Sequence, residues 1–378
     1  MNFVAIRMLT GDRAKYLGLI FAIGFASMLM AHQASIFAGL MWRTTSQIQD
    51  VRDAEVWVMD PRLRFVDEIE PLTTNDLYRV RGVDGVEWAV PFFKSTARSR
   101  TPSGHLRAVT LIGIDDATLV GAPRKLKHGA IAALRQPDAV IIDEAGYRDL
   151  WPGEPLQVGK TIEMNDRRGV VVAIADSSPP FQTLPIVYTR YSQAVQYVGR
   201  ERKQMSFVLV HPKPGADVPA LLERIQAQTG LVARTRDQWS WDTVRYYIAY
   251  TGIPVNFGIT VSLAFIVGAV VAGQTFYLFT IENLKQFGAL KAIGVSNRRL
   301  VGMILLQALI VGGIGYAIGM GLAAAFFETT KNIIHLRGFM LLWPIVAGTG
   351  VAVMVIIVAA SLLSIRRVIV LEPAAVFR

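Results

Sequence analysis

The stretch IENLKQFGALKAIGVSNRRL, at residues 281–300, lies between two long apolar runs of the chain. It is basic and amphipathic, so it cannot itself cross lipid. Its apolar residues recur at three-residue spacing, which is typical of one face of a short helix; they are Leu284, Phe287, Leu290 and Ile293. We therefore expect residues 282–299 to form a short helical link between two membrane spans, with its apolar face able to enter a groove on a soluble partner.

The composition of the whole chain is that of a membrane protein. Of its 378 residues, 52% are hydrophobic and only 18% are charged, and the mean hydropathy is +0.38. Four uncharged stretches are longer than the roughly 20 residues that a helix needs to cross a bilayer. The first is too long for the apolar part of a signal peptide and lacks a clear A-x-A site, which favours a retained helix. The predicted spans are residues 16–43, 253–281, 300–327 and 339–365, preceded by a short interfacial helix at 1–15.

The distribution of charge predicts the side of the membrane on which each segment lies. The N-terminus, the 282–299 link and the 366–378 tail together hold ten basic and three acidic residues, whereas residues 44–252 hold 26 basic and 25 acidic residues. Basic segments next to membrane spans stay in the cytoplasm. We therefore expect a multi-pass membrane protein with both termini and the link in the cytoplasm. Residues 44–252 and a short loop at 328–338 would lie outside, and the high pI is then no evidence for nucleic-acid binding.

Residues 44–252 are long enough to fold around a hydrophobic core of their own. Two sets of strands and helices are expected, one early and one late, separated by an insert at about 118–182 that would form a smaller second lobe. The fold class is therefore an α-helical membrane protein with four transmembrane helices, arranged one plus three, and an α+β extracytoplasmic domain between helices one and two. The predicted elements of this domain are strands at 54–60, 86–100, 106–114, 205–211 and 231–236, and helices at 72–81 and 218–228.

An aromatic segment at 239–250 ends the outer domain and is expected to be helical. Two interpretations of its aromatic residues stay open. They either mark a helix that passes through the membrane interface into the second span, or they pack inside the outer domain.

No residue pattern in the chain points to catalysis or to a metal site. There is no cysteine, which excludes disulfides and thiolate chemistry, and the five histidines are scattered without a metal-binding spacing. Gly159-Lys160-Thr161 resembles the end of a phosphate-binding loop, but five residues separate Gly153 from Gly159 where that loop requires four. Strands are also expected to follow, instead of the helix whose N-terminus would hold a phosphate. We predict that this chain has no catalytic residue and binds no metal or cofactor of its own.

Two features of the spans allow more than one interpretation. His32 and Gln33 lie inside the first span, where polar side chains are costly and face protein or a cavity. They are candidates for a substrate path, and interhelical hydrogen bonding is the alternative. Gly315 and Gly319 in the third span form a small-residue face for close helix packing, either inside the chain or in a dimer.

Three stretches carry a resemblance to a known family. The link reads QFGALKAIGVS at 286–296, which is close to the pattern E-x-G-x-L-K-A-[IM]-G-[AV]-[ST]. The chain's end reads LEPAAVFR at 371–378, which is similar to P-A-x-x-L-R. The outer domain has VGKTI at 158–162 followed by VVVAI at 170–174, which is similar to V-G-K-x-I…V-V-G-I. These patterns belong to permease subunits of the MacB/FtsX/LolC family of ABC transporters, which the chain resembles along its whole length. The ENLxQFGxLKA form of the link is closest to the DevC-like branch. The chain departs from the family at Gln286, which replaces an acidic residue, and at Phe287, which replaces isoleucine.

The resemblance implies a permease that transmits the motion of a separate ATP-binding subunit, which holds ATP and Mg²⁺, to the outer domain. It further implies a location in the bacterial inner membrane, a permease homodimer, a periplasmic adaptor protein, an outer-membrane channel and export of a hydrophobic or lipid-like compound. An FtsX-like regulatory protein, which activates an outer enzyme without transport, is the alternative. The residues then expected to couple to the ATPase are Glu282, Leu284, Lys285, Phe287, Gly288, Leu290, Lys291, Ile293, Gly294 and Pro373.

Overall fold

The structure, a computed structural model, describes residues 2–68, 70–101, 104–198 and 205–370 of the chain. It divides into two compact units, one formed by Met1–Gly39 with Gly252–Arg378 and the other by Leu40–Thr251. The first unit is a helical bundle and the second is an α+β domain.

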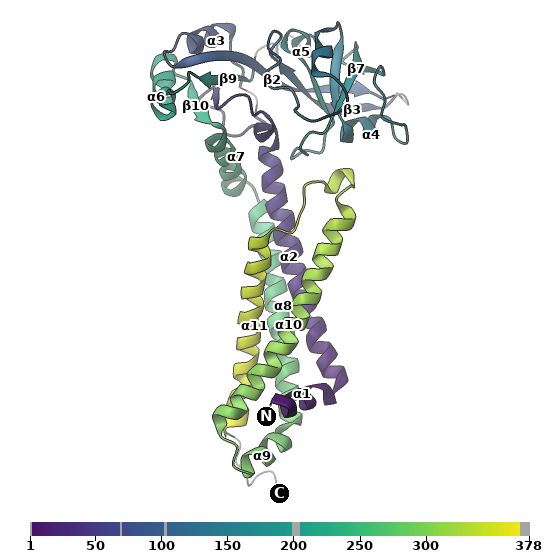
Figure 1. The fold of residues 1–378 in the computed structure, drawn as a ribbon, viewed down its shortest axis with the longest axis vertical. Coiled ribbons are helices and arrows are strands. Elements are labelled where there is room, and N and C mark those ends of the chain that lie inside the picture. The colour runs from purple at the N-terminus through teal and green to yellow at the C-terminus, as the bar shows by residue number, and fades with distance from the viewer. Residues whose placement is uncertain (1, 69, 102–103, 199–204, 371–378) are drawn as a thin grey trace. The chain divides into compact units, whose positions relative to one another are not determined.

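Four helices among the described residues are long and apolar enough to cross a membrane. They are α2 (Arg13–Asp50), α8 (Ile253–Glu282), α10 (Asn297–Thr330) and α11 (Trp343–Val370), and Figure 1 shows them side by side in the bundle. The predicted one-plus-three arrangement is confirmed. The helices α2 and α10 extend beyond their predicted spans at both ends, because the helical backbone continues into polar residues beyond the apolar run. The helix α8 agrees with its predicted span to within one residue, whereas α11 begins four residues later and ends five residues later than predicted. The predicted tail, for example, begins as the last turns of α11, and the final residues of α2 belong to the second unit.

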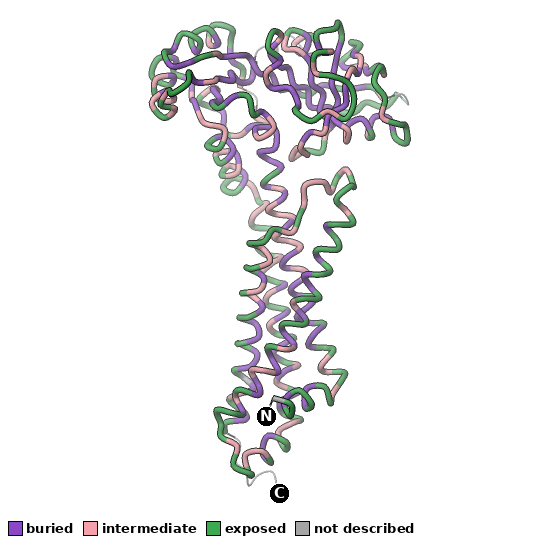
Figure 2. The backbone as a smooth tube through the Cα atoms, viewed as in Figure 1, coloured by how far each residue is buried: buried purple, intermediate pink, exposed green. Residues whose placement is uncertain are grey.

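The outward faces of the bundle helices are apolar as well as exposed. Figure 2 shows exposed positions along the helices of the bundle, and α8 has a continuous set of them. Among them are Val255, Ile259, Leu263 and Val267, each more than half exposed. Because a soluble protein rarely exposes so continuous an apolar surface, these faces belong against lipid.

The α2 and α10 helices approach each other closely at small residues. A Cβ atom on Gly319 would lie 2.4 Å from the Gly24 carbonyl oxygen and 2.7 Å from the Cβ of Ser27. A Cβ atom on Gly315 would lie 2.9 Å from the Cβ of Ile23. Since these distances are shorter than atoms tolerate, only glycine allows the two backbones to approach this closely. The small-residue face predicted in the third span is therefore used inside the chain.

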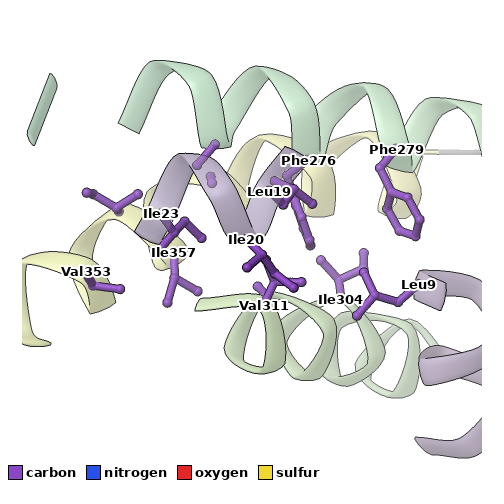
Figure 3. Close-up of a cluster of buried hydrophobic side chains, with 14 of the residues drawn as sticks. Leu9, Leu19, Ile20, Ile23, Phe276, Phe279, Ile304, Val311, Val353 and Ile357 are labelled. Carbon is purple, nitrogen blue, oxygen red and sulfur yellow. The ribbon is translucent and has the colours of Figure 1, made fainter. Parts of the chain in front are cut away.

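The centre of the bundle is filled by apolar side chains from all four long helices (Figure 3). Leu19 and Ile23 of α2 meet Phe276 of α8, Val311 of α10 and Ile357 of α11 around a cavity of only about 10 Å³. Packing contacts of this kind hold the helices together, because burial from water gives no driving force between helices in lipid.

The N-terminal helix α1 (Asn2–Gly11) also packs against the bundle. Its Ala5 and Leu9 are buried, and the Gln307 side chain of α10 donates a 2.8 Å hydrogen bond to the Ala5 carbonyl oxygen. The opposite face of α1 exposes Phe3. The helix predicted at 1–15 is thus shorter than expected, and one of its faces is held by protein.

The second unit is built on one sheet of ten described strands. Nine of them run in the order β10-β1-β9-β2-β3-β8-β5-β7-β4, and β6 pairs with β2 and β7. The strands are β1 (Val56–Met59), β2 (Val86–Arg100), β3 (Leu106–Ile114), β4 (Leu126–Gly129), β5 (Ala139–Asp143), β6 (Thr161–Met164), β7 (Arg167–Ala175), β8 (Ile186–Arg190), β9 (Phe207–Pro212) and β10 (Val232–Thr235). The helices of this unit are α3 (Thr74–Arg81), α4 (Glu144–Leu150), α5 (Tyr191–Tyr197), α6 (Val218–Thr229) and α7 (Arg236–Tyr250).

The long strand β2 passes through two lobes of this domain (Figure 1). It pairs with β9 over residues 86–92, beside α3, and with β3 over residues 93–100, beside α5. The second lobe differs from the insert expected at 118–182, because β3 pairs in parallel with β8 and so brings residues 106–114 and 186–190 into it. This lobe is therefore larger than predicted and is not a simple insertion.

The aromatic helix α7 packs inside the second unit. Trp239 is 2% exposed and its ring centroid lies 6.2 Å from that of Phe207, while Tyr246 stacks on Phe65 at 4.2 Å. Packing within the outer domain, one of the two interpretations of this segment, describes Trp239 and Tyr246. Trp241 and Tyr250 are exposed, and for them the interface interpretation stays open. The Gly159-Lys160-Thr161 sequence leads directly into strand β6, so it lacks the helix that a phosphate-binding loop requires.

Candidate functional site

The link between α8 and α10 contains a short helix, α9 (Leu284–Ala292), that begins directly after Asn283. It ends where Gly294 adopts a φ of +94°, a left-handed conformation that glycine enters without strain. Ser296 is then extended and precedes the first turn of α10. The helical part of the link is therefore shorter than the 282–299 segment expected to form it, because the turn at Gly294 interrupts it.

The inner face of α9 belongs to the core of the bundle. Phe287 is fully buried in the same apolar cluster as Phe279 of α8 and Leu300 of α10, and Gly288 is buried beside it. Leu290 is partly buried against this cluster. The prediction that Phe287 would enter a groove on a partner is wrong, because its side chain is enclosed by its own bundle. Its role is to fix α9 in place.

The outer face of α9 is formed by Lys285, Gln286 and Ala289, and the C-cap residue Ile293 continues it; we call these four residues the coupling face. All four residues are exposed, and the side chain of Ile293 is 78% exposed. Lys285, Ala289 and Ile293 follow one another at four-residue steps, which places them on one side of a helix. The coupling face therefore offers one large apolar side chain, Ile293, beside the positive charge of Lys285.

Two polar contacts tie the ends of α9 to the other helices. Lys15, near the start of α2, forms ion pairs with Asp12, at 2.7 Å, and with Glu282 at the end of α8. The hydrogen bond from Lys15 lowers the pKa of the Asp12 carboxyl, so Asp12 is ionised at neutral pH. At the other end of α9, the Lys291 ammonium donates a 2.8 Å hydrogen bond to the Ile369 carbonyl oxygen of α11. The link is thus held by α2, α8 and α11 together.

The two substrate-path candidates lie far from this link. His32 is 17 residues beyond Lys15 along α2, or about 25 Å of helix. Its ring contacts Phe326 edge-on at 4.6 Å and stacks against Phe327 at 5.6 Å, both on α10. These contacts favour helix packing for His32, and a cargo-facing role for His32 or the half-buried Gln33 stays a prediction. Pro373, the last coupling residue predicted, lies outside the described residues.

The sequence reasoning missed the contacts that hold the link. Lys15 and Glu282 are 267 positions apart, so no local pattern joins them. Gln307 is a lone polar residue in a span, which indicates a hydrogen bond without naming α1 as its acceptor. The spacing of Asp12 and Lys15, three residues apart at a helix start, is the one readable signal among them.

Comparison with protein families gives a match over most of the chain. Residues 16–228 match the model of the MacB-like periplasmic core domain, and residues 258–373 match that of the FtsX-like permease C-terminal domain. Residues 229–257, between the two matches, hold β10, α7 and the start of α8.

Several known proteins are similar to this chain. An uncharacterized ABC transporter permease of Mycobacterium tuberculosis (strain H37Rv) is 26% identical over 310 residues, covering 81% of this chain and 79% of the relative. A second uncharacterized ABC transporter permease of the same strain is 28% identical over 313 residues, with the same coverage of 81% and 79%. Among solved structures, the periplasmic region of MacB from Actinobacillus actinomycetemcomitans is 17% identical with a TM-score of 0.39, covering 54% of this chain and 96% of that one.

Proposed function

Because the chain belongs to the MacB/FtsX type of ABC transporter permeases, we propose that it transmits the motion of a separate ATP-binding subunit to its outer domain. The observation that carries this proposal is the two-sided character of α9. Its inner face is locked into the bundle by Phe287, while its coupling face is exposed. A partner that binds the coupling face therefore moves the bundle and not a loose loop.

The ties around α9 support transmission to several helices at once. A displacement of α9 acts on α11 through Lys291 and Ile369, and the adjoining end of α8 is tied to α2 by the ion pair between Glu282 and Lys15. The bundle core between these helices leaves a cavity of only about 10 Å³, so it transmits strain and offers no passage for cargo at that level. This packing supports a mechanical role for the spans.

Within the outer domain, the last turn of α2 is anchored by side-chain hydrogen bonds. Asp50 accepts bonds from the Ser178 hydroxyl at 2.7 Å and from the Ser178 backbone N–H at 2.9 Å. Gln49 donates a 2.8 Å bond to Ser240 of α7. Because α2 contributes residues to both units, a shift of this helix reaches the domain directly at these contacts.

The helix α7, which precedes α8 in the chain, is anchored in the same domain. Tyr247 donates a 3.3 Å hydrogen bond to Asp67, which forms an ion pair with the nearly buried Lys94. Burial, reinforced by the Asp67 carboxylate, raises the pKa of Tyr247, so its hydroxyl stays protonated and remains a donor. Two separate connections to the outer domain thus support the proposal that it moves with the spans.

In this proposal the protein lies in the bacterial inner membrane with both termini and α9 in the cytoplasm, as the charge distribution favours. Two permeases pair with two ATP-binding subunits, which bind ATP and Mg²⁺, and this chain binds no cofactor. The outer domain acts on a periplasmic adaptor protein joined to an outer-membrane channel. The cargo is hydrophobic or lipid-like, because the spans carry few charged groups that would form an ion path.

Affinity purification of the full chain from its native membranes tests this function. We expect an ATP-binding subunit and an adaptor protein to copurify, and ATP hydrolysis by the complex to rise with membrane lipid extracts. Copurification of the ATP-binding subunit with an outer hydrolase, without an adaptor, would replace export by the regulatory alternative. Absence of any ATP-binding protein would contradict the proposal as a whole.

A further inference from the structure

A groove of about 870 Å³ lies between α8 and α11, toward the end of each helix. It has an apolar part and a polar part. Its apolar lining consists of Ala269, Val270, Gly273 and Val370, and its polar lining consists of Gln274, Tyr277, Arg366 and Arg367. None of these eight described residues is acidic, so the lining itself does not neutralise the two arginines.

The polar part of the groove is arranged around the arginines. Arg366 and Arg367 are both exposed, and the Arg367 guanidinium lies over the Tyr277 ring at 5.8 Å. This cation–π contact holds the guanidinium at the groove. Guanidinium groups bind phosphate oxygens through paired hydrogen bonds, and the Gln274 amide supplies further donors.

The apolar part of the groove has free space beside Gly273, which is itself a buried residue of α8. A Cβ atom added to this residue would meet no atom within 4 Å, so the helix surface is hollowed there. The groove therefore combines space for a hydrocarbon chain with a paired positive charge at the basic end of two membrane spans. A phospholipid has this combination of parts, and a free phosphate ion has only one of them.

We propose that the groove binds one anionic phospholipid of the leaflet at this end of the bundle. Its phosphate lies on Arg366 and Arg367, and one acyl chain lies along Gly273 and Ala269. A second copy of this chain is a poorer occupant, because a two-fold contact would bring like-charged arginine pairs together without an acidic partner in the lining. The bound lipid joins α8 to the last turns of α11, where Ile369 accepts the hydrogen bond from Lys291.

Native mass spectrometry of the full-length protein in detergent, with added phosphatidylglycerol or phosphatidylcholine, tests this site. The double variant Arg366→Gln/Arg367→Gln should bind phosphatidylglycerol about 30-fold more weakly, since each basic residue at an anionic lipid surface contributes about fivefold. The matched control is Arg298→Gln/Arg299→Gln, which removes the same charge from another exposed pair next to the same link. The control should bind phosphatidylglycerol as the parent does.

A third variant, Gly273→Leu, fills the groove without changing charge. It should also lose the bound phosphatidylglycerol, and because its site is open it should unfold at the parent's temperature. Equal binding of both lipids, equal losses in the two arginine variants, or full binding by Gly273→Leu would each overturn the proposal. Disulfide cross-linking between two copies through Val270→Cys would overturn it too, by showing that a second chain fills the groove.

Discussion

The Lys291 ammonium lies 2.8 Å from the Ile369 carbonyl oxygen, which joins the last turn of α9 to the end of α11. Carbonyl groups in the last turn of a helix have no partner within the helix and carry the negative end of its dipole. A cation at this position therefore satisfies the carbonyl and favours the helix end. The contact makes Lys291 a link inside the bundle, whereas Lys285 points to the solvent on the coupling face.

Replacing Lys291 by methionine should leave binding of the ATP-binding subunit intact but impair transmission of its motion to the bundle. The side chain keeps its length but loses the hydrogen bond to Ile369, so we expect the ATP-binding subunit to copurify normally while lipid-stimulated hydrolysis falls. The cost in stability should be small, about 0.3–1 kcal/mol for a cation at a helix end. Lys285→Met is the matched control and should weaken copurification instead. The same loss in both variants would show that Lys291 contacts the partner directly.

Replacing Phe287 by alanine should destabilise the bundle. A fully buried phenylalanine truncated to alanine costs about 3–5 kcal/mol, because a cavity remains in a packed core. Ile293→Ala, at an exposed site, should change stability by less than about 0.5 kcal/mol and yet weaken copurification of the ATP-binding subunit. Thermal unfolding in detergent and affinity purification measure the two effects. Normal stability of Phe287→Ala would contradict the burial of its side chain.

The close approach of α2 and α10 can be tested at two nearby glycines. Gly319→Leu should lower the unfolding temperature sharply, because its side chain would collide with the Gly24 backbone. Gly321→Leu should be tolerated, since a Cβ atom there meets nothing within 4 Å. If instead both variants kept the parent's unfolding temperature and lost only dimer formation, the glycine face would belong to an interface between chains.

Replacing Asp67 by alanine should destabilise the outer domain. Lys94, whose side chain is 9% exposed, would lose its ion-pair partner, and an uncompensated charge of this kind costs about 3–5 kcal/mol. Asp84→Ala breaks the exposed pair with Lys213 and should cost no more than about 1 kcal/mol. Thermal unfolding of the full-length variants distinguishes them. Equal costs would mean that Lys94 finds another partner or reaches water.

Much of the fold could be predicted because its signals are local. The uncharged runs identify the four spans, and β2 and β3 have the predicted bounds, since Val-rich and aromatic runs bounded by turn residues favour strands. Thr73 caps α3 and Gly230 ends α6 in the left-handed conformation, as their residue types indicate.

The remainder depends on contacts between distant residues. An amphipathic pattern shows that α9 has an apolar face, but it cannot show whether that face meets a partner or the chain's own core. For this reason the sequence predicts that Phe287 contacts a partner, whereas its side chain packs in the chain's own core. The same limit hid the packing of α1 against Gln307 and the pairing of β3 with β8, which enlarges the second lobe.

The central claim is that the coupling face of α9 meets an ATP-binding subunit in the cytoplasm. Because the chain has no native thiol, single cysteines report on one position each. Ile293→Cys should form a cross-link with the copurified ATP-binding subunit and should be protected from an impermeant maleimide in intact spheroplasts. Asp84→Cys, on the outer domain, should be labelled by the maleimide and form no such cross-link. The reverse pattern, with position 293 labelled from outside and position 84 cross-linked, would contradict the account.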